Sequence, residues 1–148
     1  MDRRQFLLAA LGVPLFLRPA AAAMPLEVFK SPTCGCCAAW AAHMTRAGFA
    51  VTAKNVGQSV LWDLKARSGI SPKLSSCHTA FVEGYVVEGH VPADDVRRLL
   101  AERPEALGLA LPGMPIGSPG MEMGSRRDPF DTLLIRRDGA TEVFAHHA

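Results

Sequence analysis

The order of strand and helix signals between residues 24 and 69 most constrains the fold. Residues 26–30 and 49–55 alternate in polarity with β-branched or aromatic side chains at their centres, and both predict strands. Between them, residues 36–47 contain neither Gly nor Pro and carry apolar side chains at helical spacing. A second helical pattern runs from Gln58 to Gly69. This alternation is typical of a parallel βαβ unit.

The second half of the chain predicts a hairpin, a helix and a second hairpin. Residues 79–82 and 85–91 flank a Glu83-Gly84 turn, and a helix is expected from Pro92 to Pro104. The order βαβ followed by ββα predicts an α/β fold, a thioredoxin-like domain of two layers. Residues 108–124 hold five Gly, three Pro and three Met without a period and predict a loop. Residues 132–137 and 140–144 predict the C-terminal hairpin.

The first 23 residues predict a cleaved export signal, with the domain spanning residues 24–148. Arg3 and Arg4 precede an apolar run over residues 6–17, and small residues follow it. The two arginines and the Phe-Leu pair after them resemble the twin-arginine signature, although an ordinary export signal remains the alternative. Both routes predict a periplasmic location. The run is too short to cross a bilayer, so no stable membrane insertion is expected after cleavage.

The charge balance disfavours nucleic acid as a partner. The chain has 148 residues, 16 Lys+Arg and 14 Asp+Glu, and removal of the signal leaves 13 basic and 13 acidic residues on 125 positions. A neutral chain has no basic stripe for phosphates. About 125 residues bury one modest core, so a single domain is expected.

Four cysteines carry the chemistry. Cys34, Cys36 and Cys37 lie between the first predicted strand and helix, and Cys77 lies just ahead of the third strand. In a thioredoxin-like arrangement these two places face each other, so the four sulfurs are expected to converge. The helix start favours thiolates, which bind metals and attack disulfides.

Structural disulfides are the first interpretation of this cluster. Adjacent Cys36 and Cys37 are too close for a usual bridge. The open pairings are Cys34–Cys37 with Cys36–Cys77, or Cys34–Cys36 with Cys37–Cys77. Each pairing includes a bridge that closes a loop of a few residues, and such a bridge stabilises the fold little.

A thiol–disulfide oxidoreductase is the second interpretation. Cys34 and Cys37 form a C-x-x-C pair at a helix start, a spacing that suits an attacking and a resolving thiol. The additional thiols of Cys36 and Cys77 argue against it. Cys77-His78 also stands where thioredoxin-like redox enzymes carry a proline.

A soft-metal site is the third interpretation and the favoured one. Crowded thiolates select Cu(I), zinc or iron–sulfur clusters. Three nearly consecutive cysteines fit a tetrahedral zinc ion poorly, whereas Cu(I) accepts low coordination and bridging thiolates, which favours a multinuclear Cu(I) site. His78 is a further candidate ligand if the chain bends beside Cys77, because adjacent strand residues point to opposite faces. Less certain ligands are His90, Met114, Met121 and Met123; methionine also fills gaps in cores.

Several motifs together resemble one known family. They are residues 30–37 (KSPTCGCC), 76–79 (SCHT), 83–92 (EGYVVEGHVP), 111–115 (LPGMP) and 117–122 (GSPGME). The chain is similar, from about residue 26 to 144, to the CopG-type periplasmic copper-resistance family, formerly a domain of unknown function. The resemblance implies a thioredoxin-like fold and copper bound by Cys34, Cys36, Cys37 and Cys77, with His78 beside them. It also implies a part in copper detoxification, including interconversion of Cu(I) and Cu(II).

The sequence therefore predicts a periplasmic copper-binding protein that holds Cu(I) in a cysteine-thiolate cluster. Its expected partners are copper ions and other periplasmic copper-handling proteins. The alternative is a thiol–disulfide oxidoreductase that uses the Cys34/Cys37 pair, so the protein is either a binding protein or a copper or thiol redox enzyme.

Overall fold

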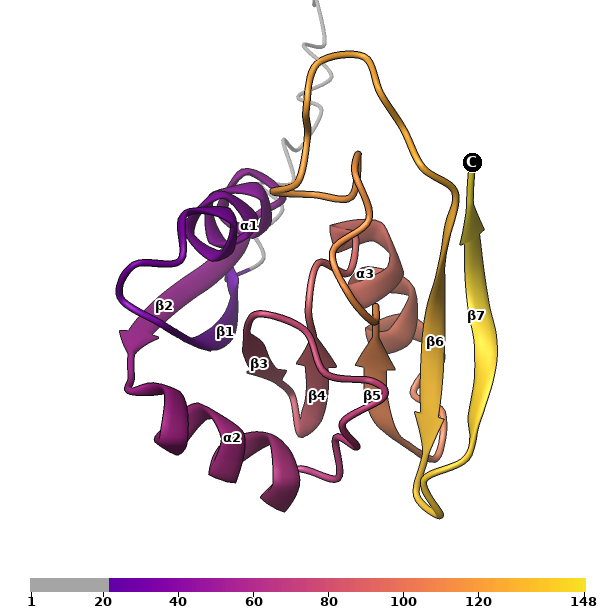
Figure 1. Cartoon of the computed structure of the whole chain (residues 1–148). Coiled ribbons are helices and arrows are strands. Elements are labelled where there is room, and N and C mark those ends of the chain that lie inside the picture. Colours follow the sequence, from indigo (N-terminus) through magenta and orange to yellow (C-terminus); the bar gives the residue numbers. More distant parts are fainter. Residues whose placement is uncertain (1–21) are drawn as a thin grey trace, which may run out of the picture.

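The chain folds into a mixed α/β structure with a seven-stranded sheet (Figure 1). The computed structural model describes residues 22–148, so the predicted export signal lies almost entirely outside the described residues. The elements in chain order are β1 (Met24–Lys30), α1 (Gly35–Arg46), β2 (Phe49–Asn55), α2 (Gln58–Arg67), β3 (Thr79–Val82), β4 (Tyr85–Glu88), α3 (Ala93–Glu102), β5 (Ala106–Ala110), β6 (Phe130–Arg136) and β7 (Thr141–His147).

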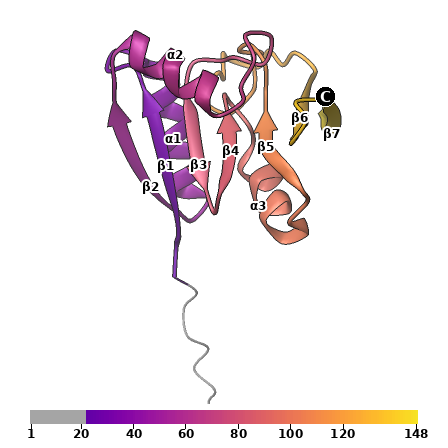
Figure 2. The same cartoon turned by 90° about the horizontal axis from the view of Figure 1, so that it is seen from below.

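The strand order confirms the predicted supersecondary units. The sheet runs β2-β1-β3-β4-β5-β6-β7, as Figure 2 shows from below. β1 and β2 are parallel and joined through α1, which is the predicted βαβ unit. β3 pairs antiparallel with both β1 and β4, and β6 pairs antiparallel with β7. The second hairpin begins two residues earlier and ends three residues later than the sequence predicted.

The helices cover both faces of the sheet, so the predicted two-layer arrangement is wrong. In Figure 1, α1 and α3 lie on one side of β3 and β4, and α2 lies on the other. The strands explain this, because β4 is buried along its whole length. Val87 belongs to the large core under α1 and α3, whereas adjacent Val86 belongs to a smaller cluster on the α2 side. Successive strand residues point to opposite faces, and here both faces are apolar.

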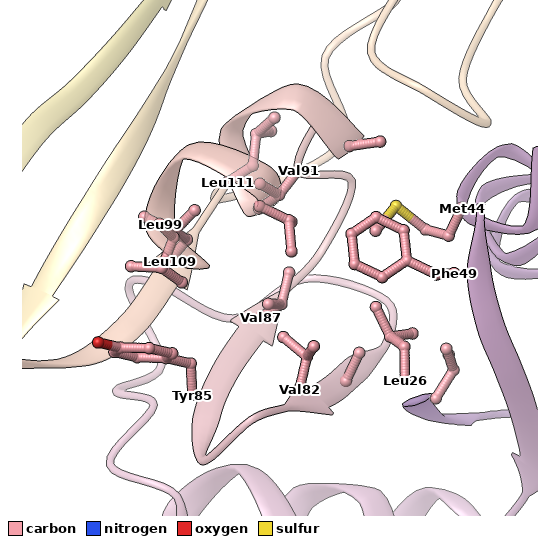
Figure 3. Close-up of a cluster of buried hydrophobic side chains, with 14 of the residues drawn as sticks. Leu26, Met44, Phe49, Val82, Tyr85, Val87, Val91, Leu99, Leu109 and Leu111 are labelled. Carbon is pink, nitrogen blue, oxygen red and sulfur yellow. The ribbon is translucent and has the colours of Figure 1, made fainter. Parts of the chain in front are cut away.

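The large core holds the βαβ unit to the second half of the domain. Figure 3 shows Leu26 of β1, Met44 of α1, Val87 of β4 and Leu99 of α3 converging on it. Trp40 is also fully buried there, and its indole N–H donates to the carbonyl of Val91 at 2.8 Å. This packing fixes α1, and with it the cysteine-rich start of that helix, against the sheet.

Strand β5 was missed by the sequence analysis, which predicted a loop from residue 108. β5 pairs parallel with β4 and antiparallel with β6, so it connects the domain core to the C-terminal hairpin. A Cβ on Gly108 would lie 1.8 Å from the carbonyl oxygen of Val86, so glycine permits this close pairing. β4 also ends earlier than predicted, because Gly89 turns the chain with a φ of +76°.

None of the helices within residues 22–148 combines the length and the apolar character that a membrane crossing requires.

Candidate copper site

The start of α1 presents three of the four cysteines. The turn after β1 is closed by a hydrogen bond from the Cys34 amide to the carbonyl of Ser31 at 3.2 Å. Cys34 is the N-cap of α1, and its Sγ accepts from the amide of Cys37 at 3.3 Å. Cys34 and Cys37 form a disulfide, while Cys36 and Cys77 are free thiols. The disulfide belongs to the first of the pairings that the sequence left open.

The four sulfurs converge as the sequence predicted. The Sγ atom of Cys36 lies 3.5 Å from that of Cys34 and 3.7 Å from that of Cys77. All four Sγ atoms lie within 4.8 Å of one another. Cys37 is buried, and the other three cysteines are half-buried. A group of sulfurs this compact can hold a soft metal ion once its thiols are available, so the donor set fits copper.

Two further predicted ligands contact Cys77 directly. Its Sγ lies 2.7 Å from Met114 Sδ and 3.3 Å from His90 Nε2. His90 Nδ1 lies 2.8 Å from the carbonyl oxygen of Pro119, which can only accept, so Nδ1 carries the proton and Nε2 offers a lone pair to Cys77. Burial, with the Cys36 thiol as the second cause, raises the pKa of Cys77 to about 11. Cys77 is therefore a protonated thiol in this form of the protein.

His78, the residue after Cys77, lies beside the imidazole of His90. The chain bends at Cys77, which supplies the change of direction that the sequence analysis required. The imidazole of His78 is fully buried and packs 4.5 Å from the Trp40 ring and 5.0 Å, edge-on, from the His90 ring. Neither ring nitrogen has a hydrogen-bond partner among the described residues. Burial, followed by the electrostatic influence of the neighbouring His90 ring, lowers the pKa of His78 well below its ordinary value.

The loop between β5 and β6 forms part of the site's wall. A Cβ on Gly120 would lie 2.7 Å from the carbonyl oxygen of Cys36, so the loop rests directly on the start of α1 (Figure 1). Met121 is held in the loop by backbone hydrogen bonds with Gly117 and Ser118, and Met123 is 61% exposed. Met114 is thus the methionine placed on the cysteine cluster, and copper binding by Met121 and Met123 stays a prediction.

A surface groove opens onto the cluster between the loop and the start of α2. Its lining residues are Ser31, Cys34, Gln58, Ser75, Ser76, Cys77, Gly113 and Met114. This groove gives ions and small thiols a route to Cys34 and Cys77.

A buried ion pair between α2 and β4, near Cys77, was not predicted from the sequence. Lys65 of α2 and Glu88 of β4 meet at 2.5 Å, with side chains 5% and 0% exposed. The signals were weak: Lys65 follows buried Leu61 by four residues, so both lie on one helix face, and Glu88 ends an otherwise apolar strand. Glu88 also accepts from the amide of Ser76 at 2.6 Å.

Known proteins resemble this chain along most of its length. A family model described as "Protein of unknown function, DUF411" matches residues 74–121. A solved structure named "Copper resistance protein copG- Form 2" is 40% identical with a TM-score of 0.79, and the match covers 85% of this chain and 99% of that one. The chain belongs to the CopG family. A second CopG structure, "Form 1", matches at 40% identity with a TM-score of 0.78 over 84% of this chain and 98% of that one.

Membership of the CopG family confirms the resemblance that the sequence motifs indicated. The solved CopG structures are named as copper-resistance proteins, and the present chain has a cysteine cluster able to hold a metal. No curated protein matches the chain.

Proposed function

We propose that this CopG-family protein serves copper resistance by holding Cu(I) on the thiolates of Cys34, Cys36, Cys37 and Cys77. The observation that carries the proposal is the position of all four Sγ atoms within 4.8 Å of one another. The thioether of Met114 and the imidazole of His90 adjoin Cys77 and add soft or borderline donors. Sulfurs at this spacing suit bridging coordination, which supports a multinuclear Cu(I) site with His78 as an outlying candidate ligand.

The scaffold we propose for this site is thioredoxin-like. The βαβ unit is followed by the β3–β4 hairpin and α3, in the order that the sequence predicted for such a domain. The three cysteines of residues 34–37 lie at the N-terminus of α1, where the helix dipole and free amides stabilise thiolates.

The disulfide supplies a redox component to the proposal. With Cys34 and Cys37 oxidised, two of the four sulfurs cannot act as thiolate ligands. Reduction by two electrons and two protons restores all four thiols. In the opposite direction, two Cu(II) ions each accept one electron while the thiolates of Cys34 and Cys37 form the S–S bond, which yields two Cu(I) ions. The two electrons exchanged when two copper ions interconvert between Cu(I) and Cu(II) therefore equal the two electrons held by this one disulfide.

We also propose that the protein works in the periplasm after removal of residues 1–23. Within residues 22–148, the first strand begins with Met24, the first residue after the predicted cleavage site, which supports this boundary. Cell fractionation tests it: replacement of Arg3 and Arg4 by Lys should strand the precursor in the cytoplasm if export uses the twin-arginine route.

A thiol–disulfide oxidoreductase is the second candidate function. The observation that favours it is the Cys34–Cys37 disulfide at the start of a helix, with the free thiol of Cys36 3.5 Å from Cys34. In this alternative the protein exchanges disulfides with other thiols and holds no metal in service.

Anaerobic copper titration of the fully reduced protein separates the two functions. We expect uptake of more than one Cu(I) per chain with thiolate-to-copper charge-transfer absorption in the ultraviolet, and a lower stoichiometry for Cys36→Ser and Cys77→Ser. Exposed Ser125→Ala is the control and should bind as the unaltered protein does. Weak, sub-stoichiometric uptake that the two cysteine variants do not change would contradict copper binding. Efficient reduction of a model disulfide by a Cys36→Ser/Cys77→Ser variant would then favour the oxidoreductase.

A further inference from the structure

The buried Lys65–Glu88 pair is connected to the backbone that carries Cys77. One carboxylate oxygen of Glu88 accepts from Lys65 Nζ at 2.5 Å and from the amide of Ser76 at 2.6 Å. The other accepts from the hydroxyl of Thr79 at 2.7 Å. Lys65 Nζ also donates to that hydroxyl at 3.0 Å. Glu88 thus bonds to the residues on both sides of the Cys77-His78 dipeptide.

Ser76 connects this network to the methionine at the site. Its hydroxyl donates to the carbonyl of Gly113 at 2.6 Å, and Met114 is the next residue along the chain. Ser76 itself directly precedes Cys77. Two hydrogen bonds, from the Ser76 amide to Glu88 and from the Ser76 hydroxyl to Gly113, therefore hold the segments whose sulfurs meet at 2.7 Å.

Packing alone does not account for a charged pair at this place. Replacement of a buried ion pair by apolar side chains of similar volume is often neutral or stabilising, because burial of charge is costly. An apolar pair here would leave the amide of Ser76 without its acceptor. Residues 75–78 lie outside the helices and strands, so no backbone hydrogen bond of regular secondary structure satisfies the Ser76 amide.

We propose that Glu88, held by Lys65, is a positioning residue that fixes the Ser76–Cys77 backbone and so keeps the Cys77 sulfur against Cys36 and Met114. The consequence for copper rests on the proposed function, whereas the placement of Cys77 itself does not. Glu88 touches none of the four sulfurs in this arrangement and acts through the Ser76 amide.

Two double variants separate the effect of the hydrogen-bond acceptor for the Ser76 amide from the effect of the buried Lys65–Glu88 charges. Lys65→Met/Glu88→Gln and Lys65→Met/Glu88→Leu both remove the ion pair, but only the Gln side chain retains an oxygen for the Ser76 amide. Each is made in a Cys34→Ser/Cys37→Ser background, so that Cys36 and Cys77 are the remaining thiols. Equilibration with reduced and oxidised glutathione then gives the effective concentration of Cys36 toward Cys77. Far-ultraviolet circular dichroism checks that each variant is folded.

We expect the Glu88→Leu variant to lower this effective concentration by about tenfold or more, the worth of one lost hydrogen bond of ordinary net strength. The Glu88→Gln variant should stay within about threefold of the Cys34→Ser/Cys37→Ser parent, because its side-chain oxygen still accepts from the Ser76 amide. Equal values for the two variants would overturn the proposal.

A second measurement covers the case in which the Glu88→Leu variant fails to fold. Amide hydrogen exchange, followed by nuclear magnetic resonance in the unaltered protein and the Glu88→Gln variant, should show a protected Ser76 amide. Exchange of Ser76 at the rate of an open loop, with β3 still protected, would overturn the proposal. Copper titration is read separately, on the reduced protein with all four cysteines: failure of that protein to bind copper contradicts the proposed function and leaves the glutathione result intact.

Discussion

Cys36 and Cys77 face each other across 3.7 Å, yet the chain positions them in opposite ways. Cys36 is placed locally: it lies in the first turn of α1, between the N-cap Cys34 and its hydrogen-bond partner Cys37. Cys77 lies in an irregular segment, and its neighbour Ser76 is held by Glu88 and by Gly113 from far along the chain. One half of the site is therefore built by secondary structure and the other by tertiary contacts.

This difference indicates where the site is vulnerable. A substitution disturbs the Cys36 half of the site only if it unfolds the start of α1, which the buried Trp40 anchors to the core. Perturbation of the second half requires only a change at one of several distant residues. Substitutions far from Cys77 in sequence should thus affect the site as much as substitutions next to it.

The largest effect is expected from Gly89→Ala, because Gly89 packs closely against the segment that carries Cys77. A Cβ there would lie 2.6 Å from Ser76 Cβ and 2.7 Å from the carbonyl oxygen of Leu111, at a φ of +76°. We expect the free energy of unfolding to fall by about 3 kcal/mol, from overpacking and backbone strain together. Urea denaturation measures it.

Gly84→Ala is the matched control for that variant. Gly84 has a similar φ of +85°, but no atom lies within 4 Å of an added Cβ. It should lose only the backbone term of about 1 kcal/mol. Equal losses for the two variants would mean that the crossing at Ser76 is not tightly packed.

Met114→Leu should produce the next largest effect, on copper rather than on folding. Leucine keeps the approximate volume of a half-exposed side chain but removes the sulfur 2.7 Å from Cys77. We expect the Cu(I) dissociation constant to rise about tenfold, the order expected for loss of one supporting interaction. Competition with a chromophoric Cu(I) chelator measures it. Val143→Ala, at the exposed Val143 of β7, should leave the constant unchanged, and a similar rise in both variants would count against a specific role for Met114.

An effect of similar size is expected in the pH dependence of stability. The pKa of His78 is lowered in the folded protein, mainly by burial, so the unfolded chain takes up its proton first as the pH falls. His78 therefore contributes stability above its unfolded pKa of about 6.5, and that contribution is lost below it. Between pH 7.5 and 5.5 this one group accounts for about 1.4 kcal/mol.

His78→Phe isolates that contribution. The variant should lose about 1.4 kcal/mol less than the unaltered protein between the two pH values, as urea denaturation at each pH measures. It should also be at least as stable at pH 7.5, since it removes two ring nitrogens that have no hydrogen-bond partner in the described part of the chain. If the His78→Phe variant and the unaltered protein have the same pH dependence of stability, His78 takes up its proton in the folded state.

The same contrast between local and distant contacts explains what the sequence could predict. The helix over residues 35–46 and its cysteines were predicted closely, because helical spacing and Gly48 are local signals. Strand β5 was missed because ALGLA does not alternate, and its pairing with Val86 through Gly108 depends on a distant strand.

The site shows the same limit. Convergence of the cysteines followed from the predicted order of elements, and His90 and Met114 were named as less certain ligands. The Met114 contact with Cys77 depends on the path of the loop after β5, and the His90 contact depends on the turn between β4 and α3; neither segment has a period to predict it. Lys65 and Glu88 were not predicted as a pair, because they lie in two separate elements and 23 positions apart in the sequence.

The complete burial of Cys37 gives the disulfide a direction. Cys37 is 0% exposed, whereas Cys34 is half-buried and lines the surface groove. In the oxidoreductase alternative, a thiolate from another molecule would attack the Cys34 sulfur, and Cys37 would depart as the leaving group at the positive end of a helix. The mixed disulfide would then join the incoming molecule to Cys34, with Cys36 alongside as an alternative resolving thiol. In that alternative, the partner would present its sulfur from the side of the groove.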